Sequence, residues 1–179
     1  FNGKSNFNSN ISDWDVSSGY DFRYMFSHAS EFNQDISSWD VSSGTDFSSM
    51  FAQSNFNQDI GDWNVSSGMN FSYMFYEANY FNQELGEWDV SSGSDFKHMF
   101  EENEVFTSDL SNWDMSSATD LNGMFESARA FNSDISRWDV SSVWDFEKMF
   151  SDADSFYSDL EYWNVSSATS GGDMLSGAD

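Results

Sequence analysis

Apolar residues recur along this chain in a fixed pattern with a period of about 25 residues. Every unit of the pattern opens on a phenylalanine: Phe7, Phe32, Phe56, Phe81, Phe106, Phe131 and Phe156. Successive openings are 25 residues apart, except for the 24 residues between Phe32 and Phe56. Self-similarity at such a period is typical of a solenoid, in which each unit buries its apolar face against its neighbours. We therefore predict one repeat array over residues 1–179, with seven coils that start at these phenylalanines.

The apolar columns of the repeat predict a continuous core. When each unit is numbered from its phenylalanine as position 1, position 5 is Ile or Leu and position 8 is always Trp. Since one indole can bury about 150–250 Å², we expect the tryptophan column to lie inside. Phe1 corresponds to position 20 of an earlier unit, and Asp179 to position 24 of the last unit. We expect from this that the chain is a fragment of a longer one, or that its ends are covered.

Two periods alternate within each unit and predict different elements. Positions 16, 19, 20 and 23 are apolar, as in Phe22, Met25, Phe26 and Ala29, and this spacing favours one face of a short α- or 3₁₀-helix. Positions 8 and 10 have the period of 2 that a strand shows, and a Ser-Ser turn follows. These elements match the size of a leucine-rich-repeat coil. The predicted fold is an α/β solenoid with a parallel sheet on one side and short helical turns on the other.

The motif also resembles a known repeat family. The segments FNQDISSWDVSS at 32–43 and FNSDISRWDVSS at 131–142 resemble the repeats of BspA-like leucine-rich-repeat surface proteins, found in bacterial lipoproteins, protists and algae. The resemblance implies a right-handed leucine-rich-repeat-like coil on an extracellular or cell surface. This chain departs from the family at position 13, where Gly19, Gly44, Gly68 and Gly93 replace a valine. We therefore expect looser packing at that corner.

The charge balance narrows the range of partners. The chain has 31 acidic residues against six Lys and Arg, for a formal net charge of -25. This balance argues against nucleic acids and anionic membranes, which bind through basic residues. No apolar run approaches the roughly 20 residues of a membrane helix, so we expect no membrane insertion of this segment. Self-association, other surface proteins and cations remain as partners. There is no cysteine, so no disulfide forms.

Acidic residues form columns of their own. One such column, at position 4, supplies candidate Ca²⁺ ligands, because oxygen atoms stacked at coil spacing suit that ion. These candidates are Asp35, Asp59, Glu84, Asp109, Asp134 and Asp159. A second acidic column lies at position 9, where asparagine replaces aspartate twice. The alternative for both columns is that the side-chain oxygens accept backbone N–H bonds in turns. No other cofactor is indicated.

Other columns offer sites for partners and for modification. Position 14 varies from unit to unit and includes Tyr20, Met69 and Trp144, which we take as a candidate binding surface. Four Asn-x-Ser sequons begin at Asn10, Asn64, Asn70 and Asn164, and these are candidates for glycosylation in a secretory pathway.

Nothing in the pattern points to catalysis. The two histidines, His28 and His98, fall in different columns, so we expect neither a metal cluster nor a triad around them. We therefore expect a non-enzymatic extracellular protein. The first hypothesis is a structural or filament-forming module of a cell or virion surface. The alternative is an adhesin, or an array that binds glycans or host proteins, and either form is compatible with dependence on Ca²⁺.

Overall fold

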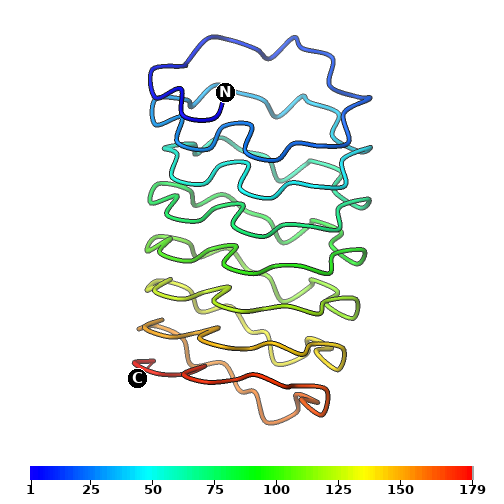
Figure 1. Cartoon of the computed structure of the whole chain (residues 1–179), viewed down its shortest axis with the longest axis vertical. Helices are drawn as coiled ribbons and strands as arrows, with labels where there is room; N and C mark the ends of the chain where they lie inside the picture. Colours follow the sequence, from blue (N-terminus) through cyan, green and yellow to red (C-terminus); the bar gives the residue numbers. More distant parts are fainter. Residues whose placement is uncertain (179) are drawn as a thin grey trace.

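The chain winds into a stack of coils that lie side by side in sequence order (Figure 1). The computed structural model describes residues 1–178, and the two ends of the chain lie at opposite ends of the stack. The coils follow the repeat: residues 7–31, 32–55, 56–80, 81–105, 106–130, 131–155 and 156–178, called coils 1 to 7 below. Residues 1–6 lie on coil 1, where the N–H of Gly3 donates to the carbonyl of Ser27 at 2.8 Å.

The predicted helices and parallel sheet are absent from the described residues, which contain no helix and no extended strand. Sheet-like pairing is limited to isolated parallel bridges between position 15 of successive coils. These bridges join Asp21, Asp46, Asn70, Asp95, Asp120, Asp145 and Ser170 in order. No helix of the described chain is therefore long and apolar enough to cross a membrane. The fold is a repetitive, largely irregular coil around an aromatic core.

Backbone hydrogen bonds explain why neither element forms. Along positions 16–22, the N–H groups at even positions donate to the next coil, as Phe75 does to the carbonyl of Met99 at 2.9 Å. The N–H groups at odd positions close turns within their own coil, as Met74 does to the carbonyl of Phe71 at 3.1 Å. A helix requires each N–H to reach the carbonyl four residues back. In this alternation every second N–H leaves the coil, so a helix cannot form.

Positive φ angles at positions 18 and 22 bend the chain into these turns. In coil 3 they are Tyr73 (φ 57°) and Glu77 (φ 50°), and the corresponding residues of every other coil also have positive φ. A positive φ at the second central residue is what a type II turn requires. Consecutive four-residue turns place positions 16, 19, 20 and 23 on the inner side, as a helix would. The apolar spacing was therefore read correctly as one buried face and wrongly as a helix.

The core is a set of stacked aromatic columns. The ring of Phe75 lies 4.0 Å from Phe81, at the start of the next coil, and 5.5 Å from its own equivalent Phe100. The same contacts recur through the stack. The tryptophans of coils 2 to 7 are buried, with Trp88 only 3% exposed, which confirms the predicted core. Trp14 of coil 1 is 48% exposed, with Phe1 packed against its ring at 5.7 Å.

Each buried tryptophan also ties two coils together through its indole nitrogen. The Nε1–H of Trp88 donates to the carbonyl of Ile60 at 3.0 Å, and Trp113 bonds the carbonyl of Leu85 at 2.9 Å. The acceptor is always the position 5 carbonyl of the preceding coil. The tryptophan column therefore combines apolar burial with a second bond to a carbonyl that also accepts a backbone N–H of its own coil, as Ile60 does from Trp63 at 3.1 Å.

The glycines at position 13 tighten the packing, contrary to expectation. Gly44, Gly68 and Gly93 are buried, and a Cβ built on each would collide with the position 16 phenylalanine of its own coil. In coil 5 the pair changes together, because Ala118 stands with the smaller Leu121. Glycine leaves this space to the ring in coils 2 to 4, whereas coil 6 buries Val143 together with Phe146.

A ladder of asparagines runs along position 2. The Oδ1 of Asn57 accepts the backbone N–H of Asn82 at 3.0 Å and the Nε2 of Gln83 at 2.8 Å. The preceding steps repeat this bond, from Asn33 to Asn8 and from Asn57 to Asn33. Side chains thus continue the pairing between coils where the backbone does not pair directly.

We predict that Trp88→Ala destabilises the stack far more than Trp14→Ala. Removing a buried indole costs about 3–5 kcal/mol, and here it also removes one of the two hydrogen bonds that the Ile60 carbonyl accepts. Trp14 is half exposed and lacks an equivalent bond among the described contacts, so its removal should cost less than half as much. Urea unfolding of the two variants measures the difference. Equal losses would contradict the assigned core.

Candidate functional surfaces

A row of exposed residues runs along position 14. Tyr20, Met69 and Trp144 expose 69%, 57% and 45% of their surface, whereas Thr45, Ser94 and Thr119 are only partly exposed. Its backbone is held by a bond at every step, as where the N–H of Trp144 meets the carbonyl of Thr119 at 2.9 Å. The side chains therefore project from a fixed line. That this row binds a partner stays a prediction.

The threonines of the same row add side-chain hydrogen bonds to the backbone bonds between coils at position 14. The hydroxyls of Thr45 and Thr119 donate to the position 14 carbonyl of the preceding coil, at 3.1 and 3.0 Å. Thr169 bonds the carbonyl of Trp144 in the same way, at 3.1 Å. Large apolar side chains thus stand among short polar ones that are bound to the backbone.

The acidic residues at position 4 lie on the surface and cap turns. The Oδ1 of Asp35 accepts the N–H of Ser37 at 2.9 Å and its hydroxyl at 2.7 Å. These bonds favour the charged carboxylate, so the serine hydroxyl and then its N–H lower the pKa of Asp35. Glu84 has a longer side chain and instead accepts the Ser108 hydroxyl at 3.2 Å. The remaining candidates accept the N–H two residues later: Asp59, Asp109, Asp134 and Asp159.

The position 9 column does the same. The Oδ1 of Asp40 accepts the N–H and hydroxyl of Ser42 at 3.0 and 2.6 Å, and Asn64 makes the equivalent bonds to Ser66. Asparagine fits because the acceptor oxygen is what the turn uses. The turn role expected for this column is confirmed.

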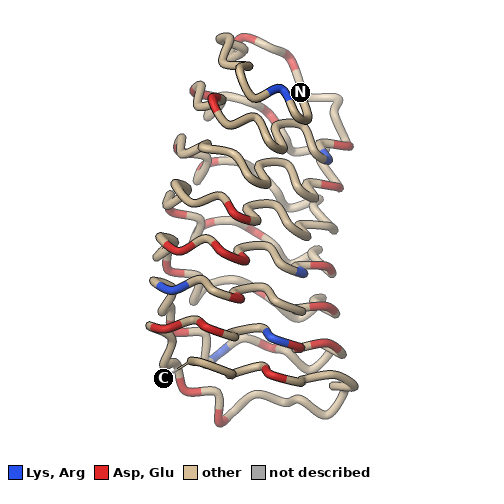
Figure 2. The backbone as a smooth tube through the Cα atoms, turned by 60° about the vertical axis from the view of Figure 1, so that its left-hand side comes forward, with Lys and Arg blue, Asp and Glu red and all other residues tan. Residues whose placement is uncertain are grey.

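Three of the calcium candidates border one groove. Asp59, Glu84 and Asp109 line a hollow of about 410 Å³ across coils 3 to 5, together with Asp62 and Glu87. Gly61 and Gly86 let the coils approach there, since a Cβ on either would lie 2.6–2.7 Å from a carbonyl of the next coil. Acidic residues recur along the stack while basic ones are few (Figure 2). Calcium binding in this column stays a prediction.

The sequon asparagines take part in turns. Asn10, Asn64 and Asn164 are exposed, and each Oδ1 accepts the N–H two residues later. Asn70 is half buried and accepts both the N–H and the hydroxyl of Ser72, at 3.0 and 2.7 Å. Its amide is therefore the least accessible of the four. Glycosylation at any of them stays a prediction.

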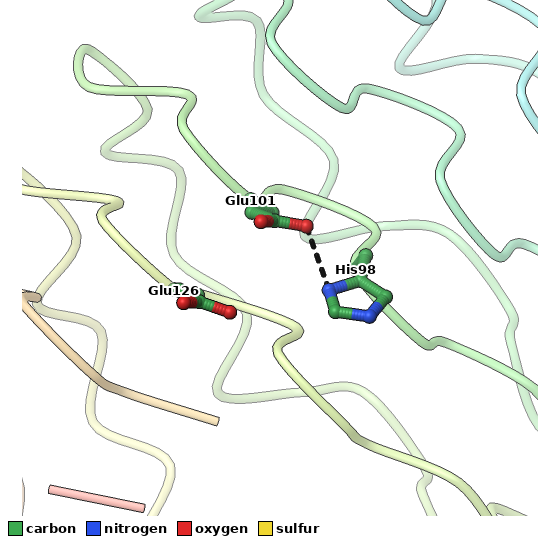
Figure 3. A group of neighbouring side chains, drawn as sticks. All are labelled: His98, Glu101 and Glu126. Carbon is green, nitrogen blue, oxygen red and sulfur yellow. Dashed lines mark ion pairs between the residues drawn. The ribbon is translucent and has the colours of Figure 1, made fainter. Parts of the chain in front are cut away.

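One group of side chains departs from the repeat. His98 and Glu101 of coil 4 face Glu126 of coil 5 (Figure 3), and one ligand atom from each lies within 4.8 Å of the others. The Nδ1 of His98 is 2.7 Å from the Oε2 of Glu101. All three side chains are only 15–16% exposed. Among residues 1–178 this is the one such group of His, Cys, Asp and Glu that could hold a metal ion.

This group was not expected from the sequence, in which the two histidines fall in different columns, and metal binding by it stays a prediction. Glu101 follows His98 by three residues, and Glu126 follows Glu101 by one repeat. These spacings are the signal that was available. It was missed because the two histidines were read by themselves, without Glu101 and Glu126 at position 21 of coils 4 and 5.

The family model described as "Mycoplasma protein of unknown function, DUF285" matches residues 1–86, 52–124 and 69–179, which together span the chain. The chain belongs to this family. No curated protein and no solved structure matches it. Since the family description names no activity, the function of this DUF285 chain has to be argued from its surfaces.

We predict that Asp35 of this DUF285 chain stabilises its turn as an acceptor of hydrogen bonds. At pH 7, Asp35→Asn should melt close to the wild type, as Asn10 occupies the same turn in coil 1, while Asp35→Ala should melt lower. The folded-state pKa of Asp35 lies below its ordinary value, so the small advantage of the charged Asp over Asn is present above pH 3.8 and is lost as the pH falls through the folded-state pKa.

Thermal melts between pH 2 and 7 measure both effects. An alanine variant as stable as the wild type at pH 7 would contradict the turn role. Repeating the melts with Ca²⁺ and with EDTA tests the calcium prediction, which requires a higher melting temperature with Ca²⁺ that Asp35→Asn reduces.

Proposed function

We propose that this chain is a non-catalytic scaffold module of a cell or virion surface, which associates with further copies of itself or with other surface proteins. The observation that carries the proposal is the directed pairing between coils. Each coil donates to the next one from positions 16, 18, 20 and 22, and each accepts from the one before at positions 15, 17, 19 and 21. The two edges of a coil are therefore complementary to each other.

Complementary edges favour head-to-tail association. A contact between two different surfaces does not close on itself unless a rotation brings it round, so repetition of the contact makes a filament. The stacked phenylalanines add an apolar face to the same edge, as in the 5.5 Å contact of Phe75 with Phe100. Both features support a structural role.

The surface location rests on likeness and on charge. The FNQDISSWDVSS and FNSDISRWDVSS segments resemble BspA-like surface repeats, and on them we propose a relationship to those proteins. A net charge of -25 favours the solubility of a protein rich in aromatic residues and limits its non-specific association. Neither feature calls for a catalytic site.

A second candidate function is the binding of a glycan or a host protein along position 14. The specific observation that favours it is the exposure of Tyr20, Met69 and Trp144 on one fixed line. Aromatic and methionine side chains are enriched at interfaces, where they contribute a large contact area.

We predict that the protein assembles into rods as its concentration rises, provided that salt screens the repulsion between its acidic residues. At 0.15 M salt the screening length is about 8 Å. Light scattering after size exclusion and negative-stain electron microscopy measure the assembly. Leu175→Pro removes the position 20 N–H of coil 7, the counterpart of the Phe150 N–H that donates to Met174 at 2.9 Å. This variant should form shorter rods or none.

Trp144→Ser is the matched control, because it changes the lateral row and leaves the edges intact. It should assemble as the wild type does. A protein that stays monomeric at all concentrations and salt levels would contradict the scaffold proposal. Binding to a glycan or protein panel that is lost in Trp144→Ser would favour the second candidate.

A further inference from the structure

Position 18 holds a different residue in each coil, and two of these residues form an unusual pair. The series is Tyr24, Ser49, Tyr73, His98, Gly123, Lys148 and Asp173. His98 is its one histidine, and Gly123, in the next coil, is its one glycine. The imidazole of one coil therefore lies against the position at which the next coil has no side chain.

Gly123 is not explained by its backbone angle. Its φ of 58° is nearly matched by six non-glycine residues of the same series, which have φ between 52° and 57°. A Cβ on Gly123 would instead collide with the Nδ1 of His98 and lie 3.3 Å from the Oε2 of Glu126. Glycine leaves open the space between these two ligand atoms.

The Nδ1 of His98 is buried and makes no properly directed hydrogen bond. The Oε2 of Glu101 lies only 2.7 Å from it, but outside hydrogen-bonding geometry. Two electron-rich atoms this close need a proton or a cation between them. The ring of Tyr73 stacks on His98 at 4.8 Å and holds the imidazole in this orientation.

We propose that His98, Glu101 and Glu126 bind a divalent transition-metal ion of the Zn²⁺ class, which bridges coils 4 and 5. Imidazole nitrogen and carboxylate oxygen are zinc ligands at about 2.0–2.2 Å. Their atoms here lie within 4.8 Å of one another, so small side-chain rotations bring them onto one ion. The imidazole favours a transition metal over Ca²⁺ or Mg²⁺, which prefer oxygen alone. Water completes the coordination on the exposed side.

Lys148 of coil 6 provides a second handle on the site. Its Nζ donates to the Oε1 of Glu126 at 3.0 Å, which raises the pKa of Lys148 and leaves Oε2 on the side of Gly123. This positive charge opposes a cation at Glu126. Removing the charge of Lys148 should raise the affinity for the metal ion. If the three residues had only a structural role, the change at Lys148 would not alter zinc affinity.

Isothermal titration with Zn²⁺ at pH 7.5, in excess Mg²⁺ to occupy the general acidic surface, tests the site. The wild type is expected to bind one zinc ion, and His98→Gln and Glu126→Gln to bind at least about 100-fold more weakly, since even outer-shell changes cost 10–100-fold. His28→Gln is the matched control and should bind as the wild type does. Lys148→Gln should bind more tightly.

The unmodified protein gives an independent reading if a variant fails to fold. Added Co²⁺ should shift the ring-proton NMR signals of His98 and leave those of His28 in place. The proposal is overturned if the wild type shows no saturable zinc binding, if the His98 and Glu126 variants bind as it does, or if Co²⁺ shifts the two histidines equally.

Discussion

The structure depends on the alternation of backbone hydrogen bonds along positions 16–22. Bonds within a coil and bonds to the next coil take turns, so the backbone of this segment is paired without a helix or a strand. The alternation requires positive φ at two positions of every coil, and twelve of these residues are not glycine. Such residues cost about 1–2 kcal/mol each in a left-handed conformation. Contacts between coils must offset that cost, so one coil cannot hold this shape alone.

The same constraint arranges the surface. Because each coil is fixed against the next by backbone bonds, position 14 becomes a bonded row with exposed large side chains and position 4 a column of capped turns. A property repeated in every coil suits a scaffold, whereas a distinct chemical site needs a break in the repeat. The described chain has such a break at Gly123, whose missing side chain leaves room for the ring of His98.

Much of the fold could be predicted from the columns. The burial of residues such as Trp39 and Trp88 followed from their recurrence. The helix prediction was wrong because two successive tight turns place Phe71, Met74, Phe75 and Ala78 on one side, as a helix does. The sheet prediction was wrong because pairing at position 15 extends over single residues. Hydrophobic spacing reports which side of the chain is buried, and it does not report where the N–H groups point.

The candidate site was less accessible to sequence reasoning. Exposure of Tyr20 and Trp144 could be predicted from the variability of their column. The approach of Glu126 to His98 could not, because it depends on the turn geometry and on the space above Gly123.

Scalar couplings across hydrogen bonds, measured by NMR on labelled protein, test the alternation most directly. The amide nitrogen of Phe75 should couple to the carbonyl carbon of Met99, in the next coil, while Met74 couples to Phe71. A coupling from Phe75 to the carbonyl of Phe71, four residues back, would show a helix and contradict the account.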